Sequence, residues 1–331
     1  MFHIPNTCVD PCYNLALEEY FLKNAPISDD LVILWQNKPT VVIGRNQNIT
    51  AEINQPFIEE HGIQVVRRLS GGGAVYHDLG NLNFTFITAL SAVGHNNFAH
   101  FTRSVITALS TFGVTAEFTG RNDLTIEGLK FSGNAQYIHR DRLLHHGTLL
   151  FETDLNMLAQ SLSGPDAKYS GPAVKSVRSR VTTISRHLPS SITLADFEAA
   201  LLRAVFASDT PYRRYDLSLT DQQSIETLAD KRYRDPKWTY ANIPDYSQNI
   251  KKTFAGGSVQ VLLNVQNNSI IQCKIYGDFF ASGDVDELAN AINGLAHQHE
   301  AVKNRIASWL AIHPIRDISP DELLSCFFNN P

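Results

Sequence analysis

The sequence predicts an α/β fold of the α+β kind, with a mixed β-sheet core, flanking helices and a small α+β C-terminal domain. Short β-rich runs dominate the first half, and helical patterns interrupt them without a regular βαβ repeat. The length of 331 residues indicates about two domains at roughly 150 residues each. Hydrophobic residues make up 43% and charged residues 18%, which is typical of an ordinary globular protein.

The first half alternates between apolar strand-like runs and segments with helical spacing. Asp154 is a candidate N-cap because its carboxylate can accept backbone N–H groups at the start of a helix. The predicted strands are residues 31–35, 40–44, 64–68 and 82–88, and the predicted helices are residues 13–23, 99–112 and 154–162.

The second half begins with a long polar loop, residues 163–180, which is rich in Gly, Pro, Ser and basic residues. A less regular stretch and then a hairpin follow the next helices, and we place the domain boundary near Tyr246. The predicted helices are residues 194–208, 221–232, 285–310 with a break at Gly294, and 321–327; the irregular stretch is 235–249, and the hairpin turns at 266–269.

Charge and cysteine content exclude several classes of protein. The formal net charge of −5 provides no global basic field for nucleic acid or anionic lipid. Four scattered cysteines form no disulfide framework and no C-x-x-C pair, which favours a reducing compartment. No signal-peptide pattern and no apolar run of membrane-spanning length occurs, so we expect a cytoplasmic protein.

A glycine-rich segment carries the strongest signal for a binding site. It reads RRLSGGGAVYHD from Arg67 to Asp78, between two apolar strands. Consecutive glycines let a backbone approach a ligand and expose N–H groups to phosphate or carboxylate oxygens. The competing interpretation is a glycine-rich hairpin with solvated arginines. The P-loop and G-x-G-x-x-G patterns are not met, so an ATP site here is of another kind.

Three further segments suit a binding site. Lys130, flanked by small residues in KFSGNA after GRNDL, can present a compact cation to acyl and phosphate oxygens, although a lone lysine is most often solvated. His145 and His146 in HHGTLL are adjacent, so a strand would point them to opposite faces, and a structural histidine is the competing interpretation. In SVRSRVT, Arg178 and Arg180 can bind phosphates or remain solvated.

Five motifs occur together in the lipoate–protein ligase family, which this sequence closely resembles from about residue 10 to Thr183. They are RRLSGGGAVYHDLGNLN, GRNDL, KFSGNA, HHGTLL and SVRSRVT, in the family's order and spacing. The segments DPCYNLALEEY and VVIGRNQN are also similar to the family. The C-terminal part resembles, more weakly, the accessory domain of bacterial members. The resemblance implies a sheet core of the biotin/lipoate ligase type in a catalytic domain, residues 1–246, and an accessory domain, residues 247–331.

The resemblance implies a two-step acyl ligation. The lipoate carboxylate attacks the α-phosphorus of ATP, with Mg²⁺ on the phosphates, and gives lipoyl-AMP and pyrophosphate. The amine of a specific lysine on an apo lipoyl domain then attacks the mixed anhydride and releases AMP. The implied acceptors are the E2 subunits of 2-oxoacid dehydrogenases and the H protein of glycine cleavage, with no nucleic-acid or membrane partner.

The resemblance also implies roles for single residues. Lys130 is the catalytic lysine that contacts the lipoyl carbonyl and the α-phosphate. No base for the acceptor lysine is identified, and the candidates for Mg²⁺ are Asp78 and Asp123. The implied ATP and lipoyl-AMP residues are Arg68, Gly73, Ala74, Val75, Tyr76, His77, Asp78, Asn122, Asp123, Lys130, Arg178 and Arg180; the implied lipoate residues are Ser70, Gly71, Gly72, Gly73, Lys130, His146 and Gly147.

Three alternatives are weighed against the ligase. An octanoyl or lipoyl transferase of the same superfamily uses a cysteine nucleophile, but no cysteine lies between Cys12 and Cys273. A biotin ligase would carry a G-R-G-R-x-G-R loop, which is absent. A silent binding module is disfavoured because Lys130 is present. Asn134 stands where some family members have serine, a small change without a functional meaning in the sequence.

Overall fold

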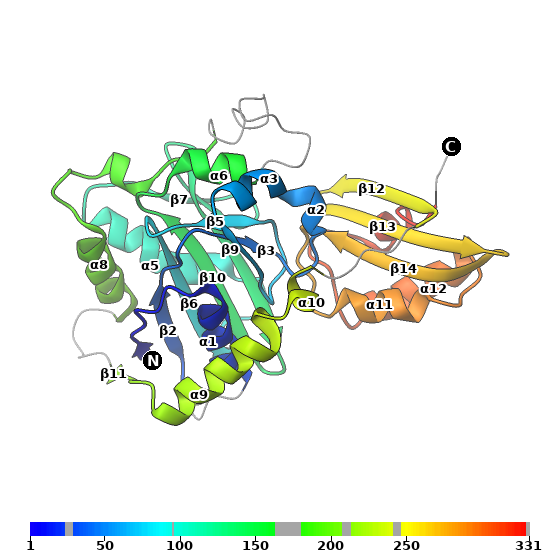
Figure 1. The fold of residues 1–331 in the computed structure, drawn as a ribbon, viewed down its shortest axis with the longest axis horizontal. Helices are drawn as coiled ribbons and strands as arrows, with labels where there is room; N and C mark the ends of the chain where they lie inside the picture. The colour runs from blue at the N-terminus through cyan, green and yellow to red at the C-terminus, as the bar shows by residue number, and fades with distance from the viewer. Residues whose placement is uncertain (24–28, 95, 163–179, 207–212, 241–245, 329–331) are drawn as a thin grey trace. The chain divides into compact units, whose positions relative to one another are not determined.

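The computed structural model describes the chain except residues 24–28, 95, 163–179, 207–212, 241–245 and 329–331. The chain divides into two compact units (Figure 1). The first unit contains Met1–Val42, Thr50–Arg67 and Val75–Thr239, and the second contains Ile43–Ile49, Arg68–Ala74 and Tyr240–Pro331. Two short loops from the N-terminal half therefore belong to the same unit as the C-terminal part. The boundary near Tyr246 stays a prediction.

A mixed sheet forms the centre of the first unit. Within the described residues it has eight strands in the order β11-β1-β2-β6-β10-β9-β8-β7. β1 runs parallel to β2 and to β11, and the remaining pairs are antiparallel. The strands are β1 (Phe2–Ile4), β2 (Leu31–Trp35), β6 (Asn81–Ala89), β7 (Glu117–Thr119), β8 (Asp123–Ile126), β9 (Leu129–His139), β10 (Arg142–Leu150) and β11 (Arg213–Arg214).

Different helices cover the two faces of this sheet. Val32 and Leu34 of β2 belong to a core cluster with α5 and α8, whereas Ile33 and Trp35 belong to a cluster with α1 and α9. Successive strand residues point to opposite faces, so β2 is apolar throughout and buried on both sides. The larger helices are α1 (Pro11–Lys23), α5 (Phe98–Ser110), α8 (Leu194–Phe206) and α9 (Leu219–Leu228).

Shorter elements complete the first unit. A small sheet has the strand order β4-β3-β5. Its strands are β3 (Thr40–Ile43), β4 (Gln64–Arg67) and β5 (Val75–His77). The short helices are α2 (Ile49–Glu52), α3 (Gln55–Glu60), α4 (Leu90–Val93), α6 (Leu155–Ser161), α10 (Pro236–Thr239), the 3₁₀ turn η1 (Ile184–His187) and the π-helical turn η2 (Ala229–Tyr233).

The second unit contains a three-stranded antiparallel sheet with helices packed against it (Figure 1). Asn267 and Asn268, both at positive φ, form the tight turn between its second and third strands, and Gly294 at φ 86° lies in the break between two helices. Its elements are β12 (Gln248–Phe254), β13 (Gly257–Gln266), β14 (Ser269–Gly277), α11 (Val285–Ile292), α12 (His299–Leu310) and α13 (Pro320–Leu324).

The predicted fold class, a mixed sheet with flanking helices and a small α+β part, is confirmed. Asp154 caps α6, the helix break lies at Gly294, and the hairpin turns where expected. Two expectations differ. The helix expected over 221–232 begins at Leu219 and continues as the π-helical η2, and the stretch expected to be irregular, 235–249, contains α10 and the start of β12. The long loop expected over 163–180 falls almost wholly outside the described residues.

No helix in the described parts of the chain has the length and apolar character needed to cross a membrane.

One buried carboxylate ties α9 to α1. Asp221 is 3% exposed and accepts hydrogen bonds from Tyr20 Oη (2.6 Å), Tyr215 Oη (2.9 Å), Ser218 Oγ (2.7 Å) and the backbone N–H of Ser218 (2.9 Å). Burial raises the pKa of Asp221, but the hydrogen bonds from these partners outweigh it, so the net pKa lies below the ordinary value.

We therefore expect Asp221→Asn to lower the free energy of unfolding at pH 7 by about 1–3 kcal/mol, because an amide cannot accept all four hydrogen bonds. The ionised form is the one that folding favours, so this contribution is complete above the unfolded-state pKa of about 3.9 and is lost as pH falls through the lower folded-state pKa. Urea titrations at pH 7 and at acidic pH measure the difference. The exposed Asp216→Asn is the control, and an equal loss in both variants would contradict the assignment.

Candidate functional site

An irregularity in the β8–β9 hairpin lies directly beside the predicted catalytic lysine. Leu124 of β8 lies opposite Ser132 of β9, and the next residue, Thr125, lies opposite Lys130. β9 therefore has one extra residue, Phe131, between these two pairs, which defines a β-bulge. A bulge reverses the facing of the residues beyond it, because side-chain direction alternates along a regular strand.

The bulge turns Lys130 to the face of the sheet that Gly133 and Asp123 share. Regular alternation would place Lys130 on the same face as Ser132. Instead, a Cβ added to Gly133 would lie 3.2 Å from Lys130 Nζ, so the lysine side chain passes over this glycine. Asp123 is the register partner of Gly133 and points to the same face. Lys130 and Asp123 are therefore brought together, as the sequence motifs suggested.

Lys130 and Asp123 form an ion pair with an Nζ–Oδ1 distance of 2.8 Å. Their side chains are 40% and 33% exposed, so both are accessible from solvent. The backbone of Lys130 is also held, because its N–H donates to Arg180 O (2.9 Å) and its carbonyl accepts from Thr182 N–H (2.8 Å). Arg180 thus lies beside the lysine in the first unit, whereas Arg178 lies outside the described residues.

Asn122 is fixed within the same hairpin by Asn134. The side-chain amide of Asn122 donates to Asn134 O (2.6 Å), and both the backbone N–H (2.9 Å) and the side-chain amide (3.0 Å) of Asn134 donate to Asn122 O. These three hydrogen bonds join β8 and β9 one residue away from Asp123 and Gly133. Asn122 thus lies next to Asp123, the ion-pair partner of Lys130. The contact of Asn122 with the adenylate stays a prediction.

The two adjacent histidines of β10 point to opposite faces, as predicted. The ring of His145 stacks on Phe101 of α5, with a centroid distance of 4.5 Å. His146 Nδ1 lies 2.9 Å from Glu18 Oε1 of α1. Since α5 and α1 cover opposite faces of the sheet, the pair cannot bind one metal ion together.

His146 belongs to a buried polar chain on the α1 face. Glu18 accepts from His146 Nδ1 and from Thr85 Oγ1 (2.5 Å), and Thr85 Oγ1 accepts from Trp35 Nε1 (2.9 Å). Glu18 is 3% exposed and His146 is 8% exposed. A buried carboxylate needs such partners because its desolvation is costly. Sequence reasoning missed Glu18, although two glutamates inside the otherwise apolar helix motif NLALEEY were a signal.

Gly147 is explained by close packing on the α5 face. A Cβ at Gly147 would lie 2.4 Å from Asn134 Oδ1 and 2.6 Å from the ring of Phe84. The glycine therefore makes room for these two side chains. Its predicted place in a lipoate pocket is untested.

The glycine-rich loop belongs to the second unit, where Arg68 organises it. Arg68 is 5% exposed; its Nε donates to Ser70 Oγ (3.0 Å), and its Nη2 donates to Gly71 O (2.6 Å) and Gly73 O (2.8 Å). The competing interpretation of a solvated arginine is therefore wrong for Arg68, whereas its predicted contact with the nucleotide stays a prediction. Gly44, in the loop Ile43–Ile49 of the same unit, must lack a side chain because a Cβ there would overlap Gly72 O.

The three consecutive glycines have different surroundings. A Cβ on Gly71 would lie 2.4 Å from Phe279 O, and Gly72 has φ 86° with the ring of Phe280 beside it. Apart from its chain neighbours, no heavy atom of the described residues lies within 4 Å of a Cβ on Gly73. Packing therefore explains Gly71 and Gly72, whereas Gly73 leaves open space beside the backbone.

Residues after the glycines, beginning with Ala74, lead into the small sheet. Tyr76 of β5 pairs with Val41 of β3. Burial raises the pKa of Tyr76. His77 Nδ1 lies 3.0 Å from Asn37 Nδ2 in the core. Val75 is the first residue of β5.

Asp78 ties a turn to the start of a helix. Its carboxylate accepts from the backbone N–H groups of Gly80 (2.9 Å) and Asp154 (2.9 Å). Burial raises the pKa of Asp78, and these hydrogen bonds oppose that shift. Groups of three or more potential metal-ligating side chains are absent from the described residues, so Asp78 and Asp123 stay single-carboxylate candidates for Mg²⁺.

Burial disfavours the thiolate form of all four cysteines. Burial raises the pKa of Cys12 to about 11, of Cys273 to about 12 and of Cys326 to about 11, and it also raises the pKa of Cys8. The thiolate is the reactive form. A thioester mechanism therefore has no activated thiol here.

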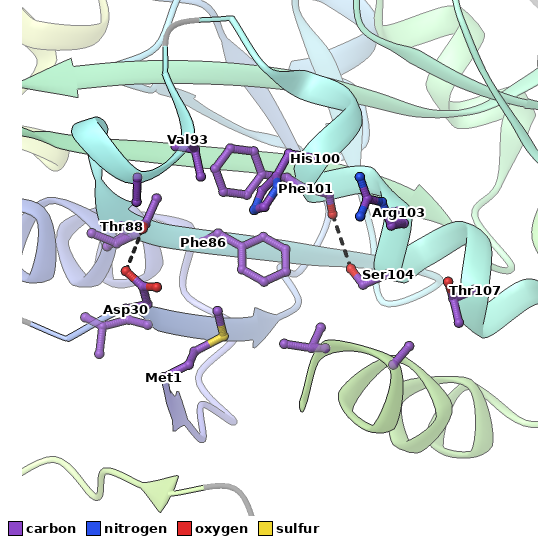
Figure 2. Close-up of a pocket in the computed structure, with 15 residues that line it drawn as sticks. Met1, Asp30, Phe86, Thr88, Val93, His100, Phe101, Arg103, Ser104 and Thr107 are labelled. Atoms are coloured by element: carbon purple, nitrogen blue, oxygen red, sulfur yellow. Dashed lines mark hydrogen bonds between the residues drawn. The ribbon is translucent and has the colours of Figure 1, made fainter. Parts of the chain in front are cut away.

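A pocket of about 350 Å³ lies on the α5 side of the sheet (Figure 2). Phe86 and Phe101 line its apolar part, and Asp30, which accepts from Thr88 Oγ1 (2.5 Å), lies at its polar edge. None of the predicted site residues lines this pocket.

Comparisons with known families match both parts of the chain. The model described as "Lipoyl protein ligase A/B catalytic domain" matches residues 10–206, and the model "Bacterial lipoate protein ligase C-terminus" matches residues 243–327. Lipoate–protein ligase 1 of Staphylococcus aureus is 40% identical, covering 96% of this chain and 97% of that one. Lipoate-protein ligase LplJ of Bacillus subtilis is 39% identical with the same coverage of 96% and 97%.

Solved structures agree with these matches. LipL1 of P. falciparum in complex with lipoate superposes with a TM-score of 0.80 at 26% identity, covering 92% of this chain and 94% of that one. A bipartite lipoate protein ligase of Thermoplasma acidophilum, described with its E2 lipoyl domain, gives a TM-score of 0.66 at 25% identity, with coverage of 75% and 98%.

The surroundings of the glycines predict unequal effects of alanine. We expect Gly71→Ala to destabilise the protein by about 1–3 kcal/mol, because its Cβ would overlap Phe279 O. Gly73→Ala should leave the unfolding temperature unchanged. Differential scanning calorimetry of both variants tests this. A Gly73→Ala loss as large as that of Gly71→Ala would show that packing also requires the third glycine.

Proposed function

The chain belongs to the lipoyl protein ligase A/B family, and we propose that it is an ATP-dependent lipoate–protein ligase. It would activate lipoate as lipoyl-AMP, release pyrophosphate and transfer the lipoyl group to a lysine of an acceptor lipoyl domain. The observation that carries this proposal is the direction of the Lys130 side chain. The β9 bulge turns this side chain to the face that Asp123 and Gly133 share. The matches to two ligase relatives, each covering 97% of the relative and 96% of this chain, support the proposal.

The proposed substrates are lipoate and ATP with Mg²⁺. Lipoate is the ligand of the P. falciparum neighbour. The open space beside Gly73 suits a phosphate that approaches backbone N–H groups. Magnesium would arrive on the ATP phosphates and needs only one or two protein carboxylates, which fits a site where Asp123 lies beside Lys130.

In the first step, a lipoate carboxylate oxygen bonds to the α-phosphorus of ATP and pyrophosphate leaves. The ammonium of Lys130 is the protein group that would offset negative charge on both reacting oxygens, because a fixed cation stabilises charge that develops in the transition state. Asp123, 2.8 Å away, orients this cation before the substrates bind. The backbone carbonyl of Arg180 accepts from the N–H of Lys130. Of the two arginines proposed for the adenylate loop, Arg180 lies within the described residues.

The acyl chain would lie on the α1 face, where Lys130 and His146 both point. Glu18 fixes the ring of His146 and both side chains are buried, so together they would form a preorganised wall of this proposed site. Ser70, Gly71 and Gly72 of the glycine loop, in the second unit, stay proposed lipoate residues.

In the second step, the acceptor lysine amine bonds to the acyl carbon and AMP leaves. The proposed acceptors are lipoyl domains of 2-oxoacid dehydrogenase E2 subunits and the H protein of glycine cleavage. Support for the first class comes from the archaeal ligase that is described with an E2 lipoyl domain. No residue is assigned as the base. We propose that both steps take place in the cytoplasm, without nucleic acid or membrane.

We expect Lys130→Ala to lower lipoate-dependent pyrophosphate release by about 10²–10³-fold, since one charge-stabilising group is removed from the transition state. Lys130→Arg should not restore the rate, because a planar guanidinium does not replace a compact ammonium. Lys251→Ala on β12 is the control for a lysine outside the site. Intact-mass detection of the acylated lipoyl domain completes the assay. Wild-type rates in Lys130→Ala would refute the catalytic assignment.

A second prediction separates the ligase from the transferase. The variants Cys8→Ala and Cys12→Ser should lipoylate an acceptor at nearly the wild-type rate and only with ATP, because both thiols have raised pKa values and neither is activated. Intact-mass measurements with lipoate and ATP, and separately with octanoyl-carrier protein alone, provide the test. ATP-independent octanoyl transfer that disappears in either variant would favour the transferase.

A further inference from the structure

A chain of hydrogen bonds runs behind the hairpin that carries Lys130, on the α5 face of the sheet. Gln136 Nε2 lies 3.1 Å from His145 Nδ1, and His145 Nε2 lies 3.3 Å from Asn134 Oδ1. Asn134 Nδ2 in turn donates to Asn122 O (3.0 Å) and Ser132 Oγ (3.2 Å). His145 is fully buried, between the rings of Phe84, Phe98 and Phe101.

The direction of each hydrogen bond follows from its chemistry. The carbonyl of Asn122 can only accept, so the side chain of Asn134 must point its NH₂ there and its Oδ1 toward His145. His145 therefore carries its proton on Nε2 and donates to Asn134. Burial holds the pKa of His145 well below its usual range, so the ring is neutral and its Nδ1 accepts from Gln136.

This network acts where the register of β8 and β9 is least secure. A bulge interrupts the β8–β9 ladder between the pairs Leu124–Ser132 and Thr125–Lys130. A slip of β8 by one residue against β9 would turn Asp123 to the face opposite Lys130. The three hydrogen bonds between Asn122 and Asn134 lock the hairpin immediately beside this point. Two of them involve a side-chain amide, and His145 fixes the orientation of one of these amides.

We propose that His145 and Asn134 are positioning residues for Lys130: the Nε2–H of His145 orients Asn134, which locks the β8–β9 register and so keeps the Lys130–Asp123 pair on the reactive face. This role rests on the proposed ligase function. This role also explains why a histidine is buried among three aromatic rings. A phenylalanine would fill the same space and would bring no polar group that needs a hydrogen bond. Asn134, which the sequence left without a role, becomes the link between the sheet core and the site.

The test uses four single variants of the full chain and the double variant His145→Phe/Asn134→Ala. His145→Phe keeps the aromatic packing but removes the donor, and His145→Gln places an amide N–H where Nε2 was. Asn134→Ala leaves the histidine stack intact and removes the link. Val105→Ala, in the same core cluster but outside the network, is the matched control for lost stability. Unfolding temperature, kcat and KM for lipoate-dependent pyrophosphate release, and amide hydrogen exchange of β9 are measured for each.

We expect His145→Phe and Asn134→Ala to lower kcat by roughly 10- to 10²-fold, with smaller changes in KM, because a displaced catalytic group weakens the transition state most. His145→Gln should recover most of this loss. The double variant should lose no more than the worse single variant, since both act through one contact. Exchange of the β9 amides should accelerate in these variants but not in Val105→Ala.

Other outcomes overturn the proposal. Wild-type kcat in folded His145→Phe, a Val105→Ala loss of the same size, or unchanged β9 exchange would each show that the network only supports stability. An inactive wild-type protein would reject the ligase function instead, and the exchange measurement would still decide whether His145 and Asn134 hold the hairpin.

Discussion

The single extra residue in β9 is the constraint on which the candidate site depends. Strand geometry allows only two directions for a side chain, so the bulge at Phe131 decides whether Lys130 points into the α5 core or toward the α1 face. With the bulge, one short hairpin presents a cation and a carboxylate side by side. The long strands β6, β9 and β10 around it supply the rigid platform that such a placement needs.

Buried polar groups on both sides of the sheet serve this placement. On the α1 face, Glu18 is stabilised by His146 and Thr85; on the α5 face, His145 is stabilised by Gln136 and Asn134. Each group would be costly to bury alone, and each is buried with directional partners. Such networks define one orientation for each ring, which apolar packing by itself does not.

Sequence reasoning predicted the family, the fold class and the elements whose apolar spacing is regular, such as β2 and α5. It predicted Lys130 and Asp123 as site residues because their motifs are local, and the structure brings the two side chains together. It could not predict the bulge, since Phe131 looks like any strand residue and its effect depends on pairing with β8. It also missed Glu18 and the meaning of Asn134, because their partners His146 and His145 are far away along the chain.

The three consecutive glycines of the glycine loop, which look alike in the sequence, have different surroundings in the structure. Three identical residues suggested one phosphate-binding device, with the competing view that glycines merely suit a turn. Gly71 and Gly72 are required by Phe279, Phe280 and a positive φ. Apart from its chain neighbours, Gly73 has no heavy atom of the described residues within 4 Å of a Cβ, and its phosphate contact stays a prediction. Arg68 is buried and donates to the carbonyls of Gly71 and Gly73, so it holds this backbone in place. A preformed loop loses little conformational freedom when a ligand binds, so the phosphate contact proposed at Gly73 would need no rearrangement of the described residues of this loop.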